Sequence, residues 1–251
     1  MKAADTVYGL HAVRVMLERH PERVVSVRLS ERRDDPRVRG IEELARLHNR
    51  PVQRVDAHSL KQMLGDVAHQ GVVAEIASLP AWTEDTLLAA LSAPSSTAPP
   101  LLLALDGVQD PHNLGACLRT ADACGALAVV VPKDRAAQLT ATVRKVAAGA
   151  AETTPVVAVT NLVRTLKLLK DAGLWIVGAD AEGPRAAHEV DLKVGIVLVL
   201  GAEGAGLRQL TRQTCDWIVR LPSLGAVESL NVSVAAAMLL YETVRQRTVT
   251  P

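Results

Sequence analysis

The chain has 251 residues, of which 49% are hydrophobic and 22% charged, and its formal net charge is +1 at pH 7. This composition allows a sizeable core in one large or two small domains, and it excludes a highly basic, histone-like nucleic-acid binder. With three Trp, two Tyr and no Phe, the sequence also argues against RNA binding by rows of stacked aromatic side chains.

The cysteines and the apolar runs indicate the compartment. Cys117, Cys124 and Cys215 form no CxxC pair, and no His stands at metal-ligand spacing. We therefore expect buried thiols in a reducing environment and no metal. No apolar run reaches transmembrane length and no signal-peptide core is evident, so we expect a soluble, cytoplasmic protein without membrane contact.

Residues 1–78 predict a small α/β domain. Apolar runs indicate strands at 24–29, 52–55 and 72–76, and helical patterns fall at 11–19, 40–48 and 59–64. A cluster of arginines surrounds one predicted loop: Arg28, Arg32, Arg33, Arg37 and Arg39. Two interpretations remain open, a solvated loop with Asp34 and Asp35 as local partners or a surface that contacts phosphates.

Residues 79–99 are rich in Pro, Ser and Ala and hold no Lys or Arg, which predicts a linker. Beyond it, residues 100–251 alternate apolar runs with helical patterns. The runs are 101–105, 127–131, 156–159, 175–179, 196–200 and 217–221, and the helical patterns include 114–124, 136–148, 162–172 and 207–214. Short apolar strands separated by helices predict a parallel sheet covered on both faces. Ligands of such sheets bind at the carboxyl ends of the strands.

The loop after the first of these strands leads through Asp110 and Pro111 into a helix, and it carries no GxGxxG nucleotide fingerprint. Asp110-Pro111 suits a turn, and Asn113 suits the N-cap of the helix. Arg119 stands two turns into an otherwise apolar helix. A plain surface arginine is the alternative to a functional one.

The loop after the fifth strand runs from Gly201 to Gly206 with Glu203 in its centre. Glycine-rich loops at strand ends bind phosphates, but a carboxylate repels them. A cationic ligand without phosphate fits better, and S-adenosylmethionine is such a ligand. A plain tight turn is the alternative.

After the sixth strand, Pro222 begins a polar loop, and Ser229-Leu230-Asn231 opens an apolar helix of roughly 230–247. A hydroxyl, an amide and the free N–H groups of a helix start lie together there, which indicates a ligand site.

These three segments, 110–119, 200–207 and 221–235, resemble in order the three motifs of the SPOUT-class RNA ribose 2′-O-methyltransferases. Tyr8-Gly-Leu-His-Ala-Val13 and His69-Gln-Gly-Val72 resemble an RNA-binding domain like ribosomal protein L30e. Further matches are Val131-Pro-Lys-Asp-Arg135 and Lys145-Val-Ala-Ala-Gly-Ala150. Together they are most similar to the branch that methylates a guanosine of bacterial 23S rRNA in the peptidyl-transferase P loop.

The resemblance implies an α/β fold of two domains, an L30e-like substrate-binding domain (1–78) and a SPOUT domain (100–251) with a deep C-terminal trefoil knot. It also implies a homodimer that uses S-adenosylmethionine as methyl donor, takes 23S rRNA as substrate and needs no metal. The implied catalytic residues are Arg119, Asn113, Glu203, Ser229 and Asn231, and the implied donor-binding positions are Ala179, Gly201, Gly206, Leu221 and Leu230. Leu221 replaces a frequent Ile of the motif, and Ser223 replaces a frequent Met. Arg119 would act either as a base or as a cation that clamps a phosphate, and we favour the clamp.

Two alternatives remain open. A 2′-O-methyltransferase acting on tRNA or on another rRNA nucleotide would share the second domain, although a tRNA enzyme is not expected to carry this N-terminal module. A non-catalytic RNA-binding assembly factor would lack donor binding, which is the observation that separates it from an enzyme.

Overall fold

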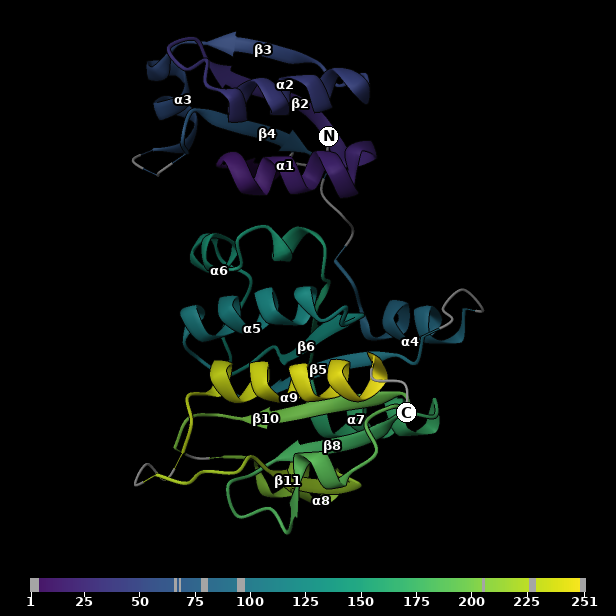
Figure 1. The fold of residues 1–251 in the computed structure, drawn as a ribbon. Helices are drawn as coiled ribbons and strands as arrows, with labels where there is room; N and C mark the ends of the chain where they lie inside the picture. The colour runs from purple at the N-terminus through teal and green to yellow at the C-terminus, as the bar shows by residue number, and fades with distance from the viewer. Residues whose placement is uncertain are drawn as a thin grey trace. The chain divides into compact units, whose positions relative to one another are not determined.

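The computed structural model describes residues 5–65, 67, 69–77, 81–93, 98–204, 206–225 and 229–248. The chain divides into two compact units, Met1–Pro80 and Ala81–Pro251, and each is described by itself (Figure 1).

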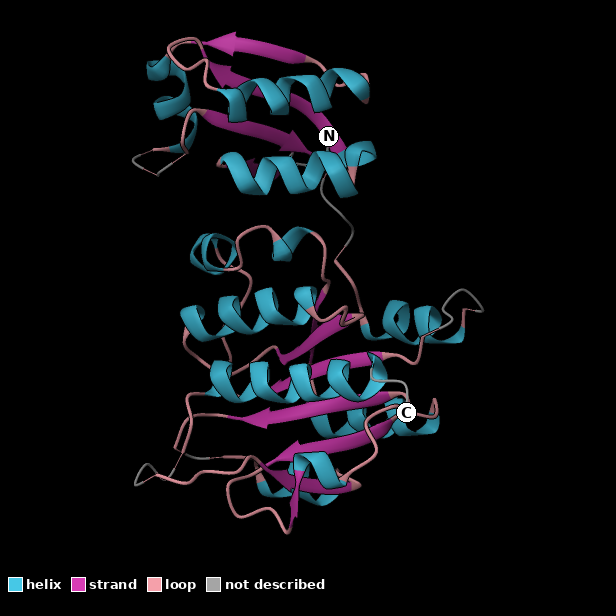
Figure 2. Ribbon diagram, in the orientation of Figure 1, coloured by secondary structure: helices cyan, strands magenta, loops and turns pink. Residues whose placement is uncertain are grey.

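The first unit is a four-stranded sheet with helices packed on it (Figure 2). Its elements are β1 (Asp5–Tyr8), α1 (Leu10–Arg19), the 3₁₀ turn η1 (Pro21–Arg23), β2 (Val24–Ser30), α2 (Pro36–Leu47), β3 (Val52–Val55), α3 (Ala57–Leu64) and β4 (Val72–Ile76). The strand order is β1-β4-β2-β3, with β4 antiparallel to β1 and β2, and β2 parallel to β3. The predicted strands and helices are confirmed, and β1 is an addition.

Two helices supply the core of this unit because their apolar residues recur three and four positions apart. Val13, Met16 and Leu17 of α1 are fully buried with the sheet residues Val27, Leu29 and Ala74. α2 buries Val38, Ile41 and Ala45 in the same cluster. This spacing places the side chains on one face of each helix, so both helices pack against the sheet.

The second unit contains a seven-stranded sheet with the order β7-β6-β5-β10-β8-β11-β9, and all its neighbouring strands pair in parallel. Its strands are β5 (Leu101–Asp106), β6 (Ala128–Pro132), β7 (Val156–Val159), β8 (Trp175–Ala179), β9 (Arg185–Ala186), β10 (Ile196–Gly201) and β11 (Trp217–Arg220). Its helices are α4 (Glu84–Ser92), α5 (Pro111–Ala123), α6 (Ala141–Val146), α7 (Leu162–Asp171), α8 (Gln209–Thr214) and α9 (Val232–Thr248), with 3₁₀ turns at Ala150–Glu152 and Ala187–Glu189. The predicted parallel sheet is confirmed, and the two-residue β9 is an addition.

Helices cover both faces of this sheet, as the all-apolar strands require. Leu101, Leu103 and Leu105 of β5 face a core that includes residues of α5, α6 and α9, while Leu102 and Ala104 face a core with residues of α4 and α7. After β11 the chain returns to α9, which packs beside α5 and against β10 (Figure 1). The trefoil knot implied by the resemblance stays a prediction.

The stretch predicted as a linker, 79–99, contains the helix α4. Thr83 caps this helix by accepting the N–H of Thr86 at 3.2 Å, and Leu87 is fully buried in the core of the second unit. Glu84 accepts a hydrogen bond from the Thr165 hydroxyl of α7 at 2.6 Å. The low charge of the stretch therefore reflects an apolar helix face as well as connecting chain.

Within the described ranges of the chain, no helix is both long enough and apolar enough to span a bilayer.

Candidate functional site

The predicted site segments lie at one edge of the second sheet, where neighbouring parallel strands end. Gly201 of β10 pairs with Asp106 of β5, and Leu200 pairs with Ala179 of β8. Ala179 in turn pairs with Val219 of β11. Because parallel strands all point the same way, the loops that follow them leave the sheet at this common edge.

The first segment starts α5 in a different way from the prediction. Asp110, not Asn113, is the N-cap: its carboxylate accepts the N–H of His112 at 2.8 Å, and Pro111 is the first helical residue. Proline suits this position because its fixed φ is helical and its missing N–H has no helical partner there. The hydrogen bond from the His112 N–H lowers the pKa of Asp110. Asn113 therefore lies inside the first turn, only 7% exposed, and its amide is available for other partners.

Asn113, Glu203 and Asn231, one from each segment, form a hydrogen-bonded group that we call the amide–carboxylate cluster. The Asn113 amide donates to Glu203 Oε1 at 3.0 Å. The Asn231 amide donates to the same oxygen at 2.7 Å and to Asn113 Oδ1 at 3.0 Å. Residues separated by 90 and 118 positions in the sequence thus meet at the strand ends.

Asn231 also begins α9. Its Oδ1 accepts the N–H of Ser233 at 2.9 Å and of Val234 at 3.4 Å, so Asn231 is the N-cap and the helix starts at Val232 rather than near 230. An amide whose oxygen caps the helix must direct its NH₂ group the other way. Capping thereby aims the Asn231 donors at Glu203 and Asn113.

The loop that carries Glu203 turns back sharply on itself. The Gly206 N–H donates to the Ala202 carbonyl at 2.9 Å, and these residues form an isolated bridge. A Cβ added to Gly201 would lie 2.0 Å from the carbonyl carbon and oxygen of Gly206. Only glycine fits at position 201, and Glu203 is exposed at the tip of the loop.

The remaining residues predicted for methyl-donor binding and catalysis, apart from Arg119, lie around this edge of the sheet. Ala179 and Leu221 are half-buried and pack against the core at the ends of β8 and β11. Ser229 and Leu230 are exposed beside Asn231. Residues 226–228 of the third segment lie outside the described residues.

Arg119 does not join the cluster. It follows Asn113 by six positions, which places it about 120° around the helix from that residue. Its side chain is exposed, and it makes no hydrogen bond or ion pair with the residues that the structure describes. The guanidinium therefore remains solvated.

The sequence interpretation missed Asp106, which is 1% exposed at the end of β5. Its Oδ2 accepts the N–H of Arg208 at 3.0 Å, and its Oδ1 lies 3.6 Å from the Arg208 guanidinium. Asp106 thus fastens the end of the Glu203 loop to the neighbouring strand. An acid directly after the wholly apolar run 101–105 was the available signal.

Two protein-family models match this chain, and together they cover most of its length. The model of the SpoU rRNA Methylase family matches residues 100–241, and a model described as RNA 2'-O ribose methyltransferase substrate binding matches residues 6–82. The chain belongs to the SpoU rRNA methylase family, and the resemblance found in the sequence is confirmed.

Among curated relatives, a protein of Pseudomonas aeruginosa named 23S rRNA (guanosine-2'-O-)-methyltransferase RlmB is 54% identical over 248 residues, with 99% of each chain covered. A protein of the same name from Coxiella burnetii is 47% identical and covers 98% of each chain. Among solved structures, the SpoU methyltransferase AviRb from Streptomyces viridochromogenes, in complex with the cofactor AdoMet, has a TM-score of 0.73 at 25% identity. That alignment covers 97% of this chain and 90% of AviRb.

Proposed function

We propose that this protein transfers the methyl group of S-adenosylmethionine to the ribose 2′-hydroxyl of a guanosine in 23S rRNA. The observation that carries the proposal is the amide–carboxylate cluster, which joins three distant segments at the carboxyl edge of the sheet. Full-length similarity to relatives named for this reaction supports the choice of substrate.

The residues at this edge fit the methyl donor. Half-buried Ala179 and Leu221 and exposed Leu230 offer apolar surface for an adenosine, and the strand ends offer backbone groups. Glu203 adds a negative charge, which suits a sulfonium cation and disfavours phosphate groups. We assign donor binding to Ala179, Gly201, Gly206, Leu221 and Leu230. When bound, the donor supplies an activated methyl group.

A ribose hydroxyl is a weak nucleophile, so it must be aligned for attack on the methyl carbon. As the new carbon–oxygen bond forms, the electrons of the carbon–sulfur bond stay on sulfur as a neutral thioether, and the hydroxyl proton passes to water. We assign alignment to Asn113, Glu203 and Asn231, which form the amide–carboxylate cluster, and to Ser229, which lies two positions before Asn231 in the same segment. The interlocked hydrogen bonds hold Glu203 in place before substrate arrives, which reduces the reorganisation needed in the transition state.

Arg119 acts in this proposal as a cation that clamps a phosphate beside the target ribose. A guanidinium loses its proton only with difficulty, and an exposed one lacks the desolvation that a base role requires. Arg119→Ala should lower kcat on the order of a hundredfold and leave donor affinity unchanged. Arg119→Lys should restore part of the rate, because it keeps the charge but loses the planar fork. Near-normal turnover by folded Arg119→Ala would remove Arg119 from the mechanism.

The homodimer is also part of the proposal. The first part of α9, Val232 to Tyr241, is apolar on both sides: Val232, Ala236 and Leu239 are buried, while Val234, Met238 and Tyr241 are 47%, 40% and 66% exposed. The exposed residues are four and three positions apart and share one face. Such a helix favours burial on both sides, and we infer that a second copy covers this face.

Light scattering coupled to size-exclusion chromatography tests the dimer. Met238→Glu should give monomers, whereas Leu47→Glu, at an exposed leucine in the first unit, should not change the mass. A monomeric parent protein at micromolar concentration would contradict the inference.

The decisive experiment maps the methylated nucleotide. The protein is incubated with labelled donor and either 23S rRNA or tRNA, and the site is located by primer extension and mass spectrometry. Methylation of a 23S guanosine supports the proposal, and methylation of tRNA favours a tRNA 2′-O-methyltransferase. If the protein does not bind the methyl donor, a non-catalytic RNA-binding assembly factor is favoured. With ribosomal RNA as substrate, the enzyme would work in the cytoplasm.

We further assign rRNA recognition to the first unit and chemistry to the second. A truncated chain for this test must begin at Ala81, because α4 buries Leu87 in the core of the second unit. It should bind the donor and lose most methylation of 23S rRNA. Undiminished methylation of the same nucleotide would show that target choice does not depend on the first unit.

A further inference from the structure

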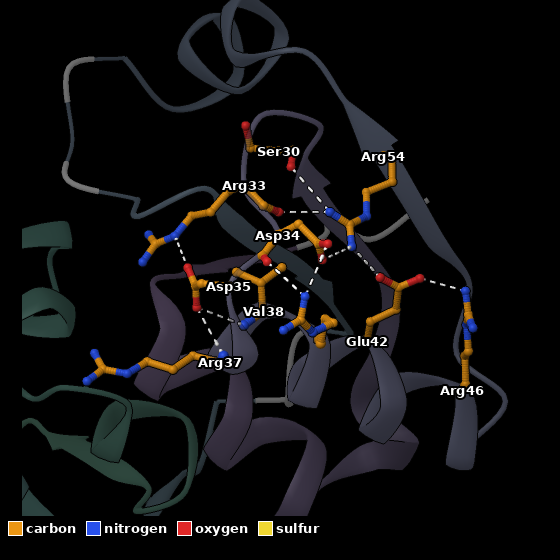
Figure 3. A network of polar contacts seen from close by, with 10 residues as sticks. Ser30, Arg33, Asp34, Asp35, Arg37, Val38, Glu42, Arg46 and Arg54 are labelled. Atoms are coloured by element: carbon orange, nitrogen blue, oxygen red, sulfur yellow. Dashed lines mark hydrogen bonds and ion pairs between the residues drawn. The ribbon is translucent and has the colours of Figure 1, made fainter.

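The arginines in and beside residues 31–35, a segment that we call the arginine turn, divide into two groups. Figure 3 shows Arg33, Arg37 and Arg54 with the acids around them. Arg33 Nε donates to Asp35 at 2.6 Å, and Arg39 Nη1 donates to Asp34 at 3.2 Å. These pairs match the solvated-loop interpretation of the sequence. The positive charges of Arg33 and Arg39 are therefore balanced by acids of the same unit.

Arg54, on β3, holds the turn from one side. Its Nη1 donates to the Arg33 carbonyl at 2.9 Å and to the Ser30 carbonyl at 3.5 Å. Its Nη2 donates to Glu42 of α2 at 2.5 Å and lies 3.8 Å from Asp34 (Figure 3). A planar guanidinium fits this set of acceptors, because its donors have fixed directions. Arg54 therefore connects the backbone of the turn to α2.

The segment before β4 holds the turn from the other side. The Ser30 N–H donates to the Gly71 carbonyl at 2.8 Å, and Arg33 Nη1 donates to the Gln70 carbonyl at 2.5 Å. Gly71 has φ +73°, and a Cβ added there would lie 3.2 Å from the Ser30 Cβ and 3.3 Å from the Arg33 Cδ. Glycine at position 71 thus gives the turn room to pack. This accounts for part of the motif His69–Val72.

Arg32 and Arg37 make the second group. Both are exposed, and neither side chain has a hydrogen bond or ion pair among the residues that the structure describes. Arg32 lies within the turn, and Arg37 lies in the first turn of α2. The neighbouring acids Asp34 and Asp35 already have arginine partners, and exposed Glu31 is the remaining acid of the turn.

We propose that Arg32 and Arg37 contact phosphates of the RNA backbone and that Arg54 is a positioning residue that presents them. This rests on the proposed function, since it names the contacts by which the first unit takes up rRNA. Unpaired guanidinium groups bind phosphate through two parallel N–H bonds, and such contacts set affinity and orientation without reading sequence. Holding the turn rigid lowers the entropy lost when these side chains engage RNA.

The salt dependence of RNA binding separates the two roles, because only a direct phosphate contact releases counterions. Affinity of the full-length protein for 23S rRNA would be measured between about 50 and 200 mM salt. Each lost contact should reduce the slope of log K against log salt by about 1, so Arg32→Ala/Arg37→Ala should reduce it by about 2. The ratio of the RNA affinity of the parent protein to that of this variant should then fall about 16-fold across the fourfold salt range. Arg54→Lys should weaken binding and leave the slope unchanged.

Arg14→Ala/Arg19→Ala is the matched control, because it removes the same charge from exposed positions of α1 in the same unit. It should leave both affinity and slope unchanged. An unchanged slope for Arg32→Ala/Arg37→Ala would overturn the contacts, and a slope reduced by Arg54→Lys would overturn the positioning role. Thermal unfolding verifies that each variant is folded.

Methylation of 23S rRNA by the parent protein is measured in parallel. If methylation fails while the salt slopes behave as expected, the proposed reaction is wrong and the RNA-contacting surface stands. If methylation succeeds and the slopes do not change, only this inference is wrong.

Discussion

Substitutions at Asn231 should reveal the coupling between helix capping and the amide–carboxylate cluster. Asn231→Ala removes the N-cap of α9, which costs about 1 kcal/mol. It also removes the donor to Glu203 and Asn113, which costs about 1 kcal/mol for an exposed hydrogen bond to a charged group. The free energy of unfolding should fall by about 2 kcal/mol, and Tm by about 4–8 °C for a domain of this size.

Asn231→Asp separates the two contributions. Aspartate is as good an N-cap as asparagine, but it would replace the amide donor, now 2.7 Å from Glu203 Oε1, by a second carboxylate. The lost hydrogen bond and a repulsion of about 1 kcal/mol should again destabilise the protein by about 2 kcal/mol. Adding Glu203→Gln supplies a new amide donor to Asp at position 231, so the double variant should recover at least half of this loss.

The assay is thermal unfolding of both single variants and the double variant, with donor affinity measured by calorimetry. Asn161→Asp is the control, because Asn161 caps α7 through its side chain and no hydrogen bond to an acid is seen there in the described chain. It should change Tm little. Exactly additive effects of Asn231→Asp and Glu203→Gln would refute the coupling.

Three further predictions follow from local geometry. Gly201→Ala should abolish donor binding in calorimetry, because its Cβ would overlap the returning backbone, whereas Gly225→Ala, with open space around it, should bind normally. Because the pKa of Asp110 is lowered in the folded protein, its charged cap stabilises the protein above pH 3.8, and this contribution disappears as pH falls through the lowered pKa. Asp110→Asn should keep the cap and lose this pH dependence, as measured by Tm against pH. Burial raises the pKa of Cys117 and Cys215 to about 12, so iodoacetamide at pH 8 should modify neither thiol in the native protein and both after unfolding, as read by mass spectrometry.

Elements could be predicted where the order of apolar and polar residues along the sequence is characteristic of a helix or a strand. Apolar runs such as 101–105 and 196–200 are too short for buried helices and too apolar for an exposed strand, so they predicted the central strands β5 and β10. The two-residue β9 has no such pattern, because its pairing with β11 depends on the neighbouring chain. The helix α4 was not predicted, because Pro and Ser on either side of its apolar residues give the stretch the composition of a linker.

Helix boundaries depended on contacts that the pattern does not contain. The helix predicted at 136–148 is shorter, Ala141–Val146, because Thr140 caps it. Before it, the Gln138 amide donates to the carbonyls of Pro132, Lys133 and Ala136, which holds that stretch as a loop. A side chain that bonds its neighbouring backbone competes with helix formation, and the period of apolar residues does not register this.

By itself, the sequence determined the class of most elements, the parallel arrangement of the second sheet and the three segments that supply the site. These follow from apolar periodicity and from the rule that ligands bind at the carboxyl ends of parallel strands. The tertiary structure decided which side chains are partners. It joined Asn113 to Asn231 across 118 positions, left Arg119 outside that cluster, and paired Arg33 while leaving Arg32 exposed. A hydrogen bond requires separations near 3 Å and a set direction, and only the packed chain fixes these between residues far apart in sequence.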